Sequence, residues 1–172
     1  QEEIAQEILD KVQPRLSGED RRRVTKRYTE NADAYQAYLQ GRFFWNKGTI
    51  DGYKRSIEYF QQAISRDPKY ALAYAGLADS YLLLGSYWVE MLPEARSAAL
   101  QALELDSSLA EAHVALGHIR LLLDWDWAAA DASFKHGLSL NANSALAHSQ
   151  YALYLATLGR PSDALAEGRR AQ

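Results

Sequence analysis

The sequence predicts an all-α solenoid of stacked antiparallel helix pairs, and three observations support that prediction. A pattern of small and aromatic residues occurs four times, starting near Ala34, Ala71, Ala110 and Ala145, which are 37, 39 and 35 residues apart. Within each copy the apolar residues recur at helical spacing, and Gly, Asn or Pro residues separate the helices. A period in the thirties is typical of helix pairs that stack to bury a continuous core.

The composition predicts a folded, soluble domain. With 172 residues, 48% hydrophobic and 24% charged, the chain lies in the ordinary range for globular proteins. Its 19 basic and 22 acidic residues give a net charge of -3, which disfavours general attraction to nucleic acid or anionic membranes. The absence of cysteine excludes disulfides and thiolate sites, and a cytoplasmic location is expected. Neither a long apolar run nor a basic signal-peptide segment is present, so no membrane association is expected.

Residues 1–30 are predicted to form an N-terminal helix and a basic connector. The apolar residues of 2–16 recur at helical spacing opposite acidic ones, which predicts one amphipathic helix. A short second helix is expected over 18–28, which contains the basic residues Arg21, Arg22, Arg23, Lys26 and Arg27. Because acidic residues flank this run, we expect a solvated surface there and no nucleic-acid contact.

Four helix pairs are predicted in the remainder of the chain. Asn31 is placed to cap the first helix, and a turn at Asp51-Gly52 is expected before the second. The expected helices cover 31–46 and 53–65, 72–85 and 93–105, a stretch from 110 with a return helix around 130–138, and a stretch from 145 with a return helix over 162–171. The corresponding repeats are about 34–70, 71–109, 110–144 and a truncated 145–172.

The second helices carry small and bulky residues in fixed slots. These slots read Ser56, Phe60, Ala63, Pro68; then Ala95, Ala99, Ala102, Ser107; then Ala130, Phe134, Gly137, Ala142; and then Ala164, Gly168, Ala171. With the aromatic and Leu-Gly slots of the first helices, the pattern resembles the tetratricopeptide repeat (TPR) over roughly residues 31–172. The resemblance implies a right-handed superhelix in which a bulky residue fills the gap between neighbouring pairs. Ala99 and Gly168 are too small to do so, and Leu100 and Leu165 are expected to compensate.

The repeats are longer than the family's usual interval of about 34 residues. We expect the excess in the turns at 47–51 and 87–92, and as a single extra residue near 125–127. The same register places Leu77 and Leu116 in the core.

A narrower resemblance concerns the strings at 34–41, 71–79, 109–113 and 124–127. They are similar to the TPR regions of multidomain bacterial regulators, in which the repeats follow a winged-helix, kinase or cyclase domain. The resemblance implies the sensor or interaction part of a larger bacterial signalling or transcription-regulatory protein. It implies no catalysis by the repeats themselves and no cofactor.

The first helices are expected to line a concave face that binds a protein or peptide partner. The register places these candidate contact residues there: Tyr35, Tyr38, Arg42, Trp45, Asp79, Leu82, His118, Leu121, Gln150 and Leu153. Chaperone-binding TPR proteins hold a partner's C-terminal carboxylate with a Lys/Asn/Arg clamp, whereas the equivalent slots here are mostly apolar. The expected ligand is an extended peptide or an amphipathic helix. An RNA-reading repeat is disfavoured by the net charge and by the scarcity of basic residues in these slots.

Two alternatives remain open on the sequence alone. Self-association is the first, because the last predicted helix would expose an apolar face containing Leu165. A carbohydrate-active enzyme using Asp124 and Asp126, next to two tryptophans, is the second. Helix capping by these acids is the simpler explanation. The four histidines show no metal-binding spacing, so no metal is expected.

Overall fold

The structure, a computed structural model, describes residues 28–172, and the predicted N-terminal helix and most of the basic connector lie outside this range. The described residues form helices and turns without a β-strand. The α-helices are α3 (Ala32–Trp45), α4 (Ile50–Arg66), α5 (Ala71–Gly85), α6 (Leu92–Leu105), α7 (Ala110–Ile119), α8 (Trp127–Leu140), α9 (Ala145–Thr157) and α10 (Pro161–Arg170). The predicted all-α solenoid is therefore confirmed.

Polar side chains fix where several helices begin. The Asn31 side chain accepts a hydrogen bond from the Ala34 amide (3.0 Å), which confirms the predicted cap of α3. The predicted turn at Asp51-Gly52 is wrong, because Thr49 caps α4 by accepting from the Gly52 amide (3.0 Å). Both residues of that expected turn therefore lie in the first turn of α4.

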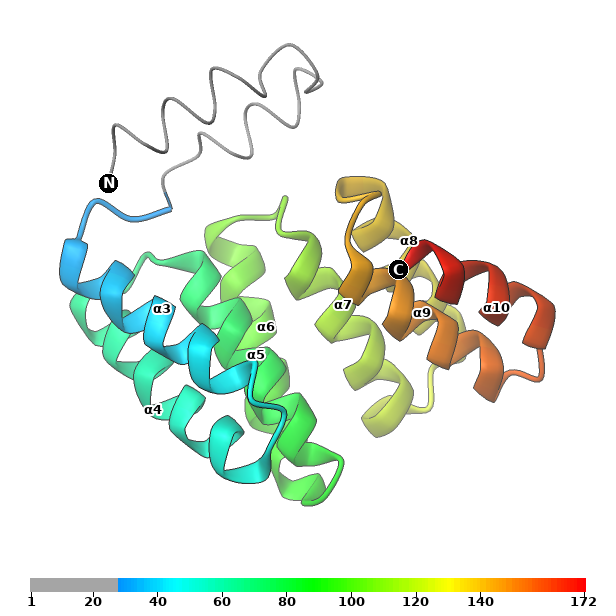
Figure 1. Cartoon of the computed structure of the whole chain (residues 1–172), viewed down its shortest axis with the longest axis horizontal. Helices are drawn as coiled ribbons and strands as arrows, with labels where there is room; N and C mark the ends of the chain where they lie inside the picture. The colour runs from blue at the N-terminus through cyan, green and yellow to red at the C-terminus, as the bar shows by residue number, and fades with distance from the viewer. Residues whose placement is uncertain (1–27) are drawn as a thin grey trace, which may run out of the picture.

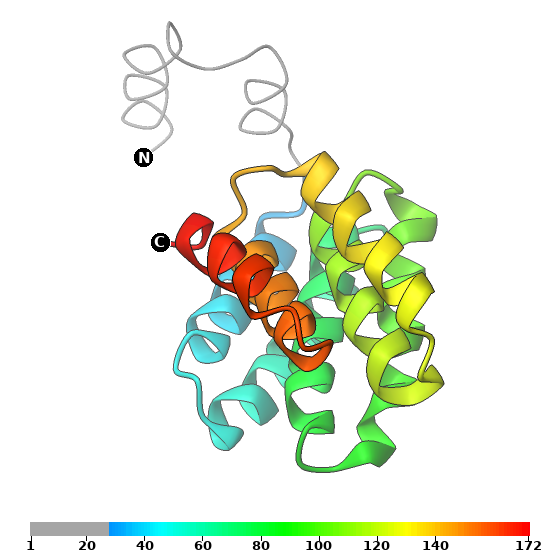
Figure 2. The same cartoon turned by 90° about the vertical axis from the view of Figure 1, so that its right-hand side faces the viewer.

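The helices pack as consecutive antiparallel pairs, which Figure 1 shows running from α3 and α4 to α9 and α10. Each first helix also contacts the next first helix, so α3, α5, α7 and α9 form a continuous row. In the view of Figure 2, α10 lies on the outside of the C-terminal end of this stack. The row of first helices brings together side chains from all four repeats.

One aromatic ring fills the junction between the first two pairs. Phe60 of α4 is fully buried, and glycines on two different helices face it. A Cβ added at Gly41 of α3 or at Gly76 of α5 would come within 2.6 Å of the ring, so the two glycines make room for it. Leu77 and Leu116 are buried as predicted (8% and 6% exposed).

The expected compensation for the small residues Ala99 and Gly168 is wrong. Leu100 and Leu165 are 51% and 58% exposed, so neither fills a gap between pairs. Ala99 is instead part of the largest core cluster, together with Leu82, Leu92 and Leu116. Leucine side chains from α5, α6 and α7 thus replace the missing aromatic ring at this junction.

The excess length of the second and third repeats is absorbed by two short irregular helices, whereas α3 and α4 of the first repeat are joined by a plain turn. A 3₁₀ turn at Val89–Met91 lies within the predicted insertion between α5 and α6. A π-helical turn at Arg120–Asp124 follows α7 and ends at Trp125, whose backbone is left-handed (φ 55°). A π-turn accommodates one extra residue in a helix, which places the single insertion just before the predicted position.

Candidate functional site

We call the surface lined by α3, α5, α7 and α9 the inner face. Three side chains occupy the same repeat position on successive helices of this face: Arg42 on α3, Asp79 on α5 and His118 on α7. They are 37 and 39 residues apart, as are the starts of the corresponding repeats. The row therefore presents a cation, a carboxyl group and an imidazole side by side along the solenoid.

The α3 end of the inner face is aromatic. The Arg42 guanidinium lies over the indole of Trp45, 4.6 Å from the ring centroid. Tyr38 packs against Phe60 and Tyr70, with ring centroids 5.7 and 5.2 Å away. Burial raises the pKa of the Tyr38 hydroxyl to about 12, although the nearby Arg42 charge lowers it. Among the described residues, the buried indole nitrogen of Trp45 has no hydrogen-bond partner.

Asp79 is the least typical residue of the inner face. Its side chain is buried (5% exposed), and no described residue forms a hydrogen bond or ion pair with its carboxyl group. Burial raises the pKa of this carboxyl to about 7, the Arg42 charge lowers it, and the Glu111 carboxylate raises it. A buried carboxyl without a partner is costly to folding, which makes it a candidate for function.

Glu111 is an inner-face residue that sequence reasoning missed. It lies in the first turn of α7 and raises the pKa of both Asp79 and Tyr38 through its charge. The repeat spacing could have found it, because it stands 39 residues after Leu72, in the position that Tyr35 occupies in the first repeat.

His118 and Gln150 join the α7 and α9 parts of the inner face. The Nδ1 atom of His118 donates a hydrogen bond to Oε1 of Gln150 (2.9 Å). The imidazole also lies edge-on to Phe134, with ring centroids 5.2 Å apart. Burial lowers the pKa of His118, while the hydrogen bond to Gln150 raises it. The structure thus brings together two candidate residues that are 32 positions apart in the chain.

The other candidate contact residues divide into exposed and buried ones. Tyr35 and Leu153 are exposed (52% and 60%) near opposite ends of the row of first helices and are open to contact by a partner. Leu82 and Leu121 are buried in two core clusters (4% and 9% exposed), so they support the inner face from beneath and present almost no surface.

Asp124 and Asp126 make structural contacts. The Asp124 carboxylate forms an ion pair with Arg96 of α6 (2.5 Å). Asp126 caps α8 by accepting a hydrogen bond from the Ala129 amide (2.9 Å), so the capping interpretation is confirmed for Asp126 and is wrong for Asp124. Both acids are therefore occupied by contacts that hold the turn between α7 and α8.

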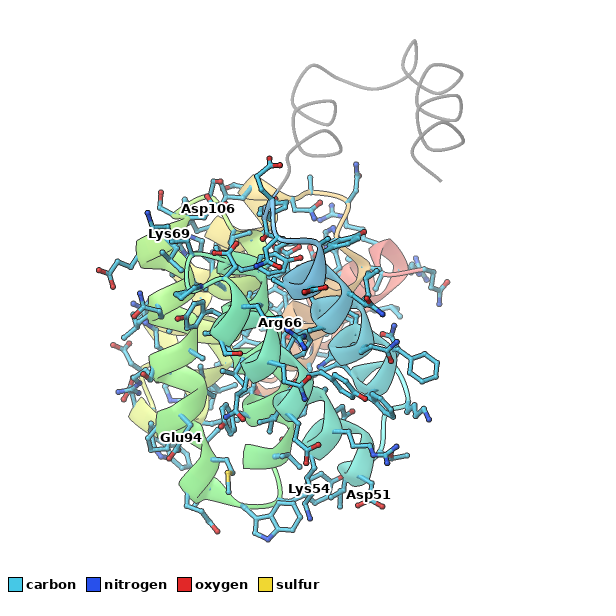
Figure 3. All side chains as sticks on the ribbon, turned by 90° about the vertical axis from the view of Figure 1, so that its left-hand side faces the viewer. Asp51, Lys54, Arg66, Lys69, Glu94 and Asp106 are labelled. Carbon is cyan, nitrogen blue, oxygen red and sulfur yellow. The ribbon has the colours of Figure 1, made fainter. Side chains whose placement is uncertain are left out.

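Other features of the described residues lie away from the inner face. Figure 3 shows Arg66 on the side of the molecule formed by α3 and α4, where a polar pocket of about 220 Å³ is lined by Arg66, Asp33, Gln36, Ala37, Gln40, Tyr59 and Gln62. Residues 28–172 contain no cluster of three or more acidic or histidine side chains that could hold a metal ion. None of the helices in this range is sufficiently long and apolar to cross a bilayer.

No family model matches the chain, and no curated protein matches it in sequence. Among solved structures, it is similar to TTC0263, a thermophilic TPR protein of Thermus thermophilus (TM-score 0.67, 24% identity, 83% of this chain and 74% of that chain). It is also similar to the first TPR of Spaghetti (RPAP3) bound to the HSP90 peptide SRMEEVD (TM-score 0.59, 18% identity, 76% of this chain and 99% of that chain). A third similar structure is MamA (TM-score 0.54, 16% identity, 91% of this chain and 93% of that chain). The chain therefore has the TPR fold, an all-α solenoid of stacked helix pairs.

Proposed function

We propose that the chain is a non-catalytic module that binds a protein or peptide segment along its inner face. The observation that supports this most strongly is the combination of groups on that face. Arg42, Asp79 and Glu111 keep hydrogen-bonding capacity that no described residue uses. Exposed apolar side chains, Tyr35 and Leu153, lie on the same row of helices. Binding surfaces commonly combine apolar contacts with a few polar groups that fix the ligand's orientation.

The structural neighbours support a peptide as the class of ligand. The first and second TPRs of Spaghetti (RPAP3) are each bound to the HSP90 peptide SRMEEVD in their solved structures. Solenoids of helix pairs present extended surfaces suited to long, thin ligands. An extended segment or an amphipathic helix would fit such a surface.

The test is a selection of random peptides by the purified chain, followed by affinity measurement on the selected peptides. We expect Tyr35→Glu and Leu153→Glu to weaken binding by about tenfold or more, because each places a charge among apolar contacts. Leu100→Glu is the matched control, since Leu100 is also exposed but lies on the second helix α6. The proposal is contradicted if no peptide is selected, or if the inner-face variants bind as well as Leu100→Glu.

We further propose that this module is the interaction part of a larger bacterial signalling or transcription-regulatory protein in the cytoplasm. The support is the similarity of strings such as those at 34–41 and 71–79 to the TPR regions of such regulators. The coding sequence upstream of Gln1 tests the proposal. A winged-helix, kinase or cyclase domain in the same reading frame is the expected result, and an unrelated upstream domain would contradict it.

Self-association is a second candidate function, favoured by apolar side chains exposed on the last helix pair. Leu165 of α10 and Leu158, just after α9, are 58% and 38% exposed. Sedimentation over a range of protein concentrations tests it. A dimer that Leu165→Glu dissociates would support this function, and a strict monomer at high concentration would remove it.

A further inference from the structure

We propose that Asp79 and Glu111 form a subsite of the inner face that binds the cationic side chain of a lysine or arginine in the bound peptide. This inference rests on the proposed function and adds a specificity to it. It depends on three features: the burial of Asp79, the position of Arg42, and the sign of the charge around the two carboxyl groups.

Asp79 is buried, yet its carboxyl oxygens still reach the surface. Only 5% of the residue is exposed, and no described residue bonds to its carboxyl group. The indole nitrogen of Trp45 is the sole side-chain polar atom in residues 28–172 that is both fully enclosed and without a partner. The equally unpartnered Asp79 oxygens are therefore not fully enclosed, and the small surface that they retain is available to a ligand.

The one nearby cation leaves Asp79 without an ion pair. Arg42 lies on the neighbouring helix α3 at the equivalent repeat position, but its guanidinium is stacked over Trp45 at 4.6 Å. None of the ion pairs formed within the described residues joins Arg42 to Asp79. The guanidinium is thus stacked on the indole and acts on the Asp79 carboxyl through its charge, without forming a salt bridge with it.

The charges select a cation and disfavour an anion. Arg42 from α3 and Glu111 from α7 are the charged groups whose fields act on the Asp79 carboxyl. The set contains two carboxyl groups and one guanidinium, so a second positive charge would balance it. A bound ammonium or guanidinium group would stabilise the ionised form of Asp79, whose pKa is raised to about 7 in the free protein. The peptide SRMEEVD, which binds a structural neighbour, is acidic overall, so the neighbour's ligand has the opposite net charge to the one expected here.

The experiment uses the peptides that the wild-type chain selects from a random library. We expect one position in these peptides to be enriched in lysine or arginine. Asp79→Asn should weaken the best peptide by about tenfold or more, because it removes the charge at nearly constant shape. Replacing the peptide's basic residue with glutamine should lower its affinity for the wild-type chain by a similar factor. The same replacement should hardly change its affinity for Asp79→Asn, which would show that Asp79 and the basic residue interact directly. Glu111→Gln should give a smaller loss in the same cycle.

Glu58→Gln is the matched control, because Glu58 is exposed on the second helix α4, and it should bind the peptide as wild type does. Binding of the basic peptide to wild type should also strengthen as the pH rises through about 7, whereas binding to Asp79→Asn should not. Selected peptides without a basic preference, or with unchanged affinity for Asp79→Asn, overturn this inference and leave the peptide-binding function intact. Failure of the wild-type chain to select any peptide overturns both.

Discussion

Two buried ionisable sites in this solenoid differ in how completely their hydrogen bonds are satisfied. In the last repeat, His148 hydrogen-bonds through Nδ1 to Glu167 (2.6 Å) and through Nε2 to the Ala142 carbonyl (2.9 Å). The second oxygen of Glu167 accepts from Arg170 (2.7 Å). In the second repeat, Asp79 is equally buried, and no described residue bonds to it. The same kind of burial therefore has two different consequences.

The difference indicates which of the two sites holds the fold together. A buried polar network whose members are all bonded fixes one arrangement of the elements that carry it. The His148–Glu167 pair joins α9 to α10 and so fixes the last helix. A buried carboxyl without a partner adds no such contact and destabilises the folded state through lost hydration. The burial of Asp79 thus adds no stabilising contact, which agrees with the proposed cation subsite.

The largest expected effect is at the satisfied pair. His148→Leu keeps a bulky side chain but leaves the Glu167 carboxylate without its main partner. Removing one member of a buried pair costs about 3 to 5 kcal/mol, and the free energy of unfolding in urea should fall by that amount. Asp163→Asn is the control, because Asp163 lies on α10 with Glu167 but pairs with Arg160 at an exposed site, and it should lower the midpoint far less. Equal midpoints for both variants would show that the pair does not stabilise α10.

The opposite sign is expected at Asp79. Asp79→Leu replaces the unpartnered carboxyl with an apolar side chain of similar size and should raise the free energy of unfolding at about pH 8 by about 2 kcal/mol. Glu58→Leu provides the comparison at an exposed site and should change it little. A loss of stability in Asp79→Leu would mean that the carboxyl has a structural partner, and the contrast with His148 would disappear.

The pH dependence of stability provides a third test. The pKa of Asp79 rises from its ordinary 3.8 to about 7 on folding, so the folded state binds more protons between these values. The contribution of this group to stability is therefore full below about pH 4 and is lost as the pH rises to about 7. Urea titrations across this range should show the advantage of Asp79→Leu over wild type growing with pH and levelling off above about 7. An advantage that does not vary with pH would contradict the assigned shift.

The smallest effect is expected at a partly exposed ion pair. Arg96 and Asp124 are 35% and 38% exposed, and water screens their attraction. Asp124→Asn should lower the free energy of unfolding by less than about 1 kcal/mol. Thermal or urea unfolding measures this directly. If Asp124→Asn lowered the free energy of unfolding as much as His148→Leu, the exposure of an ion pair would not determine how much it stabilises this fold.

The periodic parts of the fold were predictable because the core needs bulky and small residues at the same positions in each repeat. Phe60 and Phe134 each fill a junction in the same slot, and small residues recur where helices touch, so a single sequence reveals them. The start of α4 was missed because Asp51 and Gly52 are typical of turns, while the Thr49 cap that overrides them acts through one side chain. The π-turn after α7 has no sequence signature of this kind.

The candidate site was predictable in position and less so in exposure. The repeat spacing placed Arg42, Asp79 and His118 on one row. How deeply a side chain in this row is buried depends on its neighbours on adjacent helices, which is why Leu82 proved to be core while Leu153 is open. Glu111 stands in the repeat position of Tyr35 and Leu72, so the spacing marks its place on the row, but its electrostatic effect on Asp79 acts between two helices and is visible only in the structure.

Phe60 has a consequence for how the chain unfolds. Because glycines of α3 and α5 both enclose its ring, neither the first nor the second repeat can open without exposing it to water. In a repeat protein, such shared contacts are the nearest-neighbour terms that make adjacent units melt together. Amide hydrogens of α3, α4 and α5 should therefore exchange with solvent as one cooperative unit, at a common rate set by a single opening event.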